Sequence, residues 1–185
     1  KKRVTKEEWE ALGLEKRTDY ENLRRVFERI SGSKRHFDAK DLEAVFKTVG
    51  YAFAKKTEYG MNEAEDIIWE HDEECDGCIE WEVFVTAYIR SRHDATGKEP
   101  RRLYYLIEFM ICDKDGCGTM SEDECAEVLF NRFGPSALAS EETKHLFQAA
   151  GAKSDNLTYH QFQHILDHFE GKNKTDDKSS KPKKR

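Results

Sequence analysis

The chain has 185 residues, of which 37% are charged and 37% hydrophobic, and it carries a net charge of −6 at pH 7. This apolar content suffices for one or two small cores, but the longest apolar runs, such as residues 103–112, are too short to span a bilayer. The acidic body favours cations or basic partner helices and disfavours nucleic acid. We therefore expect no nucleic-acid binding and no membrane insertion, and the absence of a secretory leader predicts a cytoplasmic location.

Helix starts are marked along the chain by capping boxes, in which a side-chain oxygen and a Glu or Gln three residues later satisfy free backbone N–H groups. Pro100 suits the first turn of a helix that runs to about Cys112. Apolar residues between these starts recur at helical spacing with little alternation, so we predict an all-α protein. The capping boxes are Thr5–Glu8, Thr18–Glu21, Asn62–Glu65, Ser121–Glu124 and Thr158–Gln161.

The predicted helices form pairs around short polar loops, and the pairs repeat at about forty-residue spacing. The pairs are 19–48, 62–90, 101–131 and 141–169. The last fifteen residues are basic and contain no apolar side chain, so we expect this tail to be disordered. The predicted organisation is an N-terminal helix in 1–18, an N-terminal lobe in 19–90, a linker in 91–100, a C-terminal lobe in 101–170 and a basic tail in 171–185.

The third loop, residues 113–124, has the strongest pattern of metal ligands. A twelve-residue calcium loop takes oxygen ligands from positions 1, 3, 5, 7, 9 and 12 and has glycine at position 6, where Gly118 falls. Cys117 stands at position 5, and calcium binds a thiol poorly because it is a hard cation. We predict one functional but weakened calcium site, which magnesium could occupy in place of calcium. The ligand positions are held by Asp113, Asp115, Cys117, the Thr119 carbonyl, Ser121 through water, and Glu124.

The second loop, residues 72–83, has the same pattern but lacks the last ligand. The acids at its first, third and fifth positions are Asp72, Glu74 and Asp76. Its twelfth position is Val83, and the neighbouring Glu82 lies about 100° further round the helix axis. We therefore expect weak or vestigial calcium binding here.

The first and fourth loops, SGSKRHFDAKD and GAKSDNLTYHQ, are poor metal sites. Both contain lysine, lack a final glutamate and run about one residue short of a calcium loop. We expect them to pair with the second and third loops and to serve as structural partners.

The five cysteines are expected to be free thiols, because their number is odd and no leader directs secretion. Cys75 and Cys78 form a CxxC motif inside the second loop. A four-thiolate zinc site with Cys112 and Cys117 is disfavoured, since the two pairs fall in different predicted lobes. The alternatives for Cys75 and Cys78 are a redox-active pair and reduced side chains that fill small spaces.

The four loops resemble those of the EF-hand superfamily, in the four-hand arrangement of calmodulin and troponin C, over residues 19–170. The stretches DGCIEWEVF and EPRRLYYLIEFMICDKDGCG also resemble the EF-hand subunits of ciliary and flagellar axonemes, among them the calcium-binding subunit of the outer dynein arm docking complex. This second resemblance implies a light-chain-like role on a larger protein assembly, with a cytoskeletal location in the axoneme of a cilium or flagellum.

The favoured functional hypothesis is a calcium-binding regulatory subunit that docks on an amphipathic or coiled-coil helix of a partner protein. The alternatives are a constitutive structural adaptor with little calcium dependence, a redox-responsive variant that uses Cys75 and Cys78, and a calcium buffer. The sequence contains no nucleophile–base arrangement, phosphate-binding glycine loop or HExxH motif, so we predict that the protein is not an enzyme.

Overall fold

The computed structural model describes residues 5–53, 62–94, 96–135, 145, 147–148 and 156–179, with side chains described as far as Phe169. These residues are mostly helical, as predicted, and no helix among them is long and apolar enough to cross a membrane. The elements are α1 (Lys6–Glu10), α2 (Arg17–Ser31), β1 (His36–Asp38), α3 (Ala39–Thr48), α4 (Glu63–Trp69), β2 (Cys78–Glu80), α5 (Trp81–His93), α6 (Arg102–Cys112), β3 (Thr119–Ser121), α7 (Glu122–Phe133), β4 (Asn156–Thr158) and α10 (Tyr159–Ser179).

Short antiparallel strands connect the loops in pairs, as expected from the sequence. β1 pairs with β2, so that Phe37 lies opposite Ile79, and β3 pairs with β4, so that Met120 lies opposite Leu157. All four of these apolar side chains are buried. Each ribbon therefore joins two loops that lie far apart in the sequence and anchors the joint in the core.

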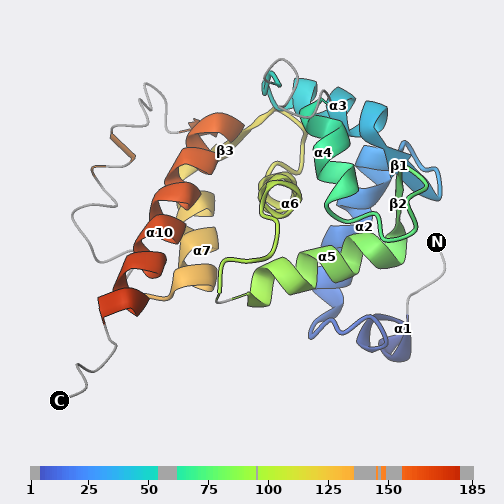
Figure 1. Ribbon diagram of the computed structural model, residues 1–185. Coiled ribbons are helices and arrows are strands. Elements are labelled where there is room, and N and C mark those ends of the chain that lie inside the picture. The colour runs from blue at the N-terminus through green and yellow to red at the C-terminus, as the bar shows by residue number, and fades with distance from the viewer. Residues whose placement is uncertain are drawn as a thin grey trace.

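Helix α6 lies at the centre of the molecule, in contact with α2, α5 and α10 (Figure 1). It is apolar on nearly every face, and the side chains of Leu103, Leu106 and Phe109 are fully buried or almost so. A helix with this pattern needs neighbours on all sides. The buried apolar residues of the described segments consequently form one core that includes both halves of the chain.

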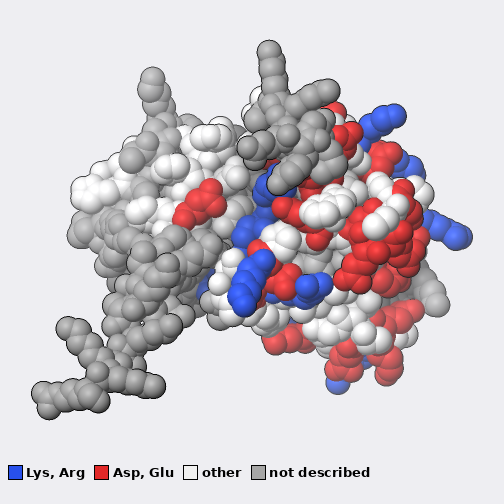
Figure 2. Space-filling model, in the orientation of Figure 1, with Lys and Arg blue, Asp and Glu red and all other residues white. Residues whose placement is uncertain are grey.

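The acidic character of the chain is unevenly distributed over its surface. Figure 2 shows Asp and Glu side chains gathered over the half of the molecule that contains α4, β2 and α5. Exposed acids in this region come mainly from the 72–83 loop and the start of α5; they are Glu73, Glu74, Asp76, Glu80 and Glu82. Part of the predicted acidic body therefore lies beside the second loop.

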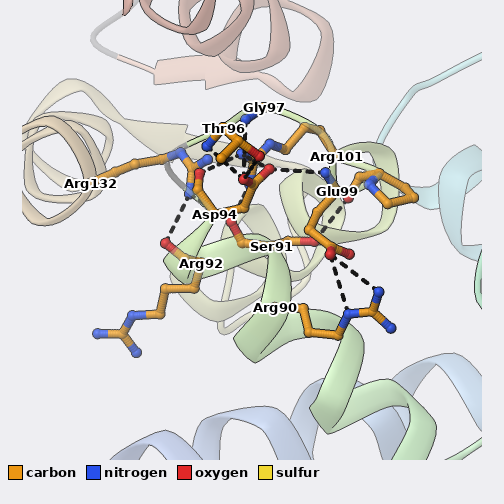
Figure 3. Close-up of polar contacts among 10 residues, drawn as sticks. Arg90, Ser91, Arg92, Asp94, Thr96, Gly97, Glu99, Arg101 and Arg132 are labelled. Carbon is orange, nitrogen blue, oxygen red and sulfur yellow. Dashed lines mark hydrogen bonds and ion pairs between the residues drawn. The ribbon is translucent and has the colours of Figure 1, made fainter.

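The segment 91–100, which was expected to be a linker between two lobes, is held by a dense set of polar contacts (Figure 3). The Asp94 carboxylate accepts hydrogen bonds from the N–H groups of Thr96, Gly97 and Glu99. Its Oδ2 also lies 3.0 Å from Nη2 of Arg101. Because the Asp94 side chain is only 6% exposed, this connection fixes the start of α6 against the end of α5.

Three sequence predictions differ from the structure at helix ends. Helix α6 begins at Arg102 with Arg101 as its N-cap, so Pro100 precedes the helix and does not lie in its first turn. Helix α2 begins at Arg17 without a side-chain cap, so Thr18 is not its capping residue; Glu21 instead accepts hydrogen bonds from the Arg17 guanidinium. Helix α10 continues to Ser179, into the tail that was expected to be disordered from residue 171. Extending an existing helix costs little, because each added residue gains a hydrogen bond.

Candidate metal centre

Residues 113–124 form a tight turn between α6 and α7. Gly116 and Gly118 have left-handed backbone conformations, with φ of 76° and 79°, which residues with a side chain rarely adopt. Strand β3 follows, and Ser121 then caps α7 by accepting a hydrogen bond from the N–H of Glu124. The turn, strand and helix start therefore lie where the twelve-residue pattern predicts them.

The side chain of Asp113, at the first position of the loop, is fully buried. Its Oδ1 accepts a hydrogen bond from the N–H of Gly118 at 3.3 Å, and its Oδ2 lies 3.1 Å from Nη2 of Arg29 in α2. Arg29 Nη1 also donates to the backbone carbonyl of Asp113 at 2.9 Å. A buried carboxylate needs such partners, because an unpaired charge in the interior is costly.

Asp113, Asp115 and Cys117 each place a ligand atom within 4.8 Å of the other two. The N–H of Cys117 donates to Asp115 Oδ1 at 3.1 Å, and this hydrogen bond lowers the pKa of Asp115. Cys117 Sγ lies 3.5 Å from the carbonyl oxygen of Thr119. Two carboxylates and a carbonyl suit a hard divalent cation, while the thiol is a soft donor. The residues thus fit calcium at these positions except for Cys117.

Glu124, at the twelfth position, lies outside this cluster. Its Oε2 accepts hydrogen bonds from the N–H of Ser121 at 2.9 Å and from the Ser121 hydroxyl at 3.0 Å. The predicted bidentate ligand is therefore the acceptor of a capping box in this structure. Coordination of a cation by both carboxylate oxygens would compete with these two hydrogen bonds.

The 72–83 loop adopts the same backbone turn as the 113–124 loop. Cys75 and Gly77 have φ of 58° and 79°, at the same fourth and sixth positions that are glycines in the other loop. The N–H of Gly77 donates to Asp72 Oδ2 at 2.7 Å. The second loop has therefore kept the turn although its ligand set has changed.

The acidic side chains of this second loop do not form a cluster among the described residues; they are Asp72, Glu74 and Asp76. The N-cap of α5 is Glu80, so Val83 occupies the third helical position. In α7 the same position carries Glu124. The structure thus gives Val83 the register that the sequence predicts, with an apolar side chain where the bidentate ligand is needed.

In the first loop a lysine side chain supplies the positive charge. Lys34 Nζ forms an ion pair with Asp41, which also accepts a hydrogen bond from the N–H of Asp38 in a capping box that the sequence analysis missed. The pairing of Phe37 with Ile79 places Asp41 at the position equivalent to Val83. Within the fourth loop, residues 151–155 lie outside the described residues.

The five cysteines are free thiols, and the candidate cluster contains one of them, Cys117. Burial and the nearby carboxylates of Asp76 and Asp38 raise the pKa of the Cys78 thiol. Because the thiolate is the reactive form, this environment slows disulfide exchange at the CxxC motif.

Two arginines of α2 belong to this region and were missed by the sequence analysis. Arg25 donates to the backbone carbonyls of Met110 at 3.0 Å and Ile111 at 2.8 Å, and Arg29 reaches Asp113 as described above. In the sequence both look like solvated charges on an amphipathic helix. No local spacing rule connects them to residues more than eighty positions away.

Neither a scan against protein-family models nor a search of curated proteins finds a match for this chain. The resemblance to the EF-hand superfamily and to axonemal subunits therefore stays a prediction. What the chain does has to be inferred from the geometry of its own residues.

Proposed function

We propose that this protein is a calcium-binding regulatory protein of the EF-hand type, with one competent loop at residues 113–124. The observation that carries the proposal is the approach of Asp113, Asp115 and Cys117 to within 4.8 Å of one another, in a loop that ends at a helix start. Calcium would bring a localised double positive charge to this loop. The groups available to hold it are the carboxylates of Asp113, Asp115 and Glu124, the Thr119 carbonyl and, through water, Ser121.

The regulatory step would involve Glu124 and the first turn of α7. In this proposal a cation draws the Glu124 carboxylate away from Ser121, and α7 moves with it because Glu124 lies in its first turn. A shift of α7 against α6 would open an apolar groove for a partner helix. The resemblance to axonemal subunits would place that partner in the dynein docking machinery of a cilium or flagellum.

A second candidate function, a constitutive structural adaptor, is favoured by the contacts of Asp113. Arg29 lies 3.1 Å from this carboxylate, so its buried charge has a partner other than an ion. Exposed apolar side chains suited to a protein partner occur at Trp69, which is 70% exposed, and Phe130, which is 47% exposed. Both would serve an adaptor as well as a sensor.

Calorimetric titration with calcium, and separately with magnesium, distinguishes the two candidates. The reduced wild type should bind one calcium ion, with a dissociation constant on the order of 10⁻⁵ to 10⁻⁴ M. Glu124→Gln keeps an acceptor for the capping box but loses the charged bidentate ligand, and should bind at least tenfold more weakly. No heat of calcium binding from the reduced wild type would exclude the sensor and leave the adaptor.

The redox-responsive alternative is tested by repeating the titration without reductant. The proteins compared are the wild type and a variant that lacks Cys75 and Cys78.

A further inference from the structure

The guanidinium of Arg29 lies directly over the candidate calcium loop. Nη2 is 3.1 Å from Asp113 Oδ2, and Nη1 is 2.9 Å from the Asp113 carbonyl oxygen. A Cβ atom added to Gly116 would stand 3.3 Å from Arg29 Nη2. The guanidinium thus contacts the loop at its first position and lies beside its fourth.

A second arginine, one turn earlier on α2, secures the same junction. Arg25 donates to the carbonyl oxygens of Met110 and Ile111, which belong to the last turn of α6. The carbonyl end of a helix carries partial negative charge and leaves acceptors without a helical partner. Helix α2 therefore presents two positive groups to the end of α6 and to the loop that follows it.

A divalent cation and the Arg29 guanidinium would compete for the carboxylate of Asp113. The carboxylate is buried with its Oδ2 paired to the guanidinium, and an ion coordinated at the first position would lie within a few ångströms of that group. Like charges this close repel, and the repulsion is strong where water is excluded. Repulsion from the cation should therefore weaken the contact between Arg29 and Asp113.

We propose that Arg29 is a built-in competitor of calcium, so that calcium binding at Asp113 and docking of α2 on the end of α6 oppose each other. The inference rests on the proposed function of the 113–124 loop. Coupling between two binding equilibria is reciprocal, so calcium loosens α2 to the same extent that α2 weakens calcium binding. Calcium binding would then change the packing of α2, in the N-terminal half of the chain, as well as that of α7.

Calcium titration of Arg29→Gln tests the competition. This variant should bind calcium about tenfold more tightly than the wild type, within the usual range of coupling between sites. Arg17→Gln is the matched control, because it removes one positive charge from the same helix at an exposed pair with Glu21. Arg29→Lys keeps the positive charge and should bind calcium nearly as weakly as the wild type.

Backbone amide hydrogen exchange across α2 provides the reciprocal measurement. Calcium should accelerate exchange in the last two turns of α2 in the wild type and in Arg17→Gln. In Arg29→Gln these amides should already exchange faster without calcium, and calcium should change them little. Circular dichroism at the titration temperature tests whether each variant is folded. If Arg29→Gln is unfolded, the calcium affinity of Arg29→Lys and the hydrogen exchange of the wild type test the competition instead.

The possible results separate this inference from the proposed function. Calcium binding by the wild type and by Arg29→Gln with equal affinity would overturn the competition and leave the calcium site standing. An Arg29→Lys affinity equal to that of the glutamine variant would also overturn it, because charge would not be the cause. Binding by neither protein would overturn both proposals. Binding by Arg29→Gln alone, abolished by a further Glu124→Gln change, would support the competition but overturn the proposed calcium sensor, because the wild type itself would not bind calcium.

Discussion

Gly118 lies so close to the backbone carbonyl oxygen of Thr48 that a Cβ atom added to the glycine would stand 2.9 Å from that oxygen. Thr48 is the last residue of α3, in the N-terminal half of the chain. Gly118 is therefore needed for two reasons, since its φ of 79° also disfavours any side chain. The candidate calcium loop is thus in contact with α3 as well as with α2.

This double requirement predicts different costs for two equivalent substitutions. Gly77 has the same φ of 79°, but nothing lies within 4 Å of a Cβ added to it. Gly77→Ala should lower the free energy of unfolding by about 1 kcal/mol through the left-handed conformation alone. Gly118→Ala should cost a further 1–3 kcal/mol, approximately, because a backbone oxygen cannot rotate away. Urea denaturation without added metal measures both, and equal losses would contradict the contact with Thr48.

Restoring the missing carboxylate should give the second loop a metal site. Val83 holds the third helical position of α5, as Glu124 does in α7, and the Asp72 carboxylate is already inside the turn. Val83→Glu should therefore raise the calorimetric calcium stoichiometry by one ion, since it returns two oxygens of the usual set. Val83→Gln is the matched control, and should add no site. An unchanged stoichiometry in Val83→Glu would mean that the turn of this loop is not suited to calcium.

The connection between α5 and α6 should be a major contributor to stability. Asp94 and Arg101 are almost buried, with side-chain exposures of 6% and 13%, and breaking such a pair leaves an uncompensated charge. Asp94→Asn should lower the free energy of unfolding by about 3 kcal/mol. Glu21→Gln, which breaks the exposed pair with Arg17, should cost less than about 0.5 kcal/mol. Similar losses in both variants would show that residues 91–100 act only as a flexible connection.

The stability of the protein should decrease as the pH falls below neutrality, partly because of His71. Burial, and then the positive charge of Arg90, lower the pKa of His71 to about 4, while a histidine in an unfolded chain titrates near 6.5. The unfolded state therefore binds more protons between these values, and up to about 3 kcal/mol is lost as the pH falls from about 6.5 to 4. Urea midpoints measured over this range should fall less steeply for His71→Gln.

Glu108 should have the opposite effect on the pH dependence. Burial raises its pKa; the carboxyl group accepts a hydrogen bond from the Tyr88 hydroxyl at 2.8 Å and lines a cavity of about 340 Å³. Because the folded state holds this proton more tightly, its contribution to stability is lost as the pH rises through the raised pKa. Glu108→Gln should therefore stabilise the protein more at pH 8 than at pH 5, relative to wild type. A gain that is the same at both values would contradict the shift.

Features that depend on near neighbours in the chain could be predicted from the sequence. The capping boxes at Thr5, Asn62, Ser121 and Thr158 are present, and the register that places Val83 and Glu124 at equivalent positions is confirmed. Thr18 was misassigned because α2 begins at Arg17, which places Thr18 inside the helix, and Glu21 meets the Arg17 guanidinium instead. Local rules also missed the capping box at Asp38 and the continuation of α10 to Ser179.

The state of the candidate ligands could not be read from the sequence. Spacing marks Asp113 and Glu124 as ligands, but Glu124 is engaged with Ser121 and Asp113 with Arg29. Each acidic residue has more than one partner within reach, and packing decides which partner it meets.

The amino-acid sequence by itself determined most of the helices, the turns of the loops and the candidate ligand positions along residues 113–124. These depend on backbone hydrogen bonds and side chains within about four residues of each other. Only the tertiary structure decided that α6 is shared by both halves and that Arg29 meets Asp113. That contact joins residues 84 positions apart, and it exists because the apolar surface of α6 requires α2 beside it.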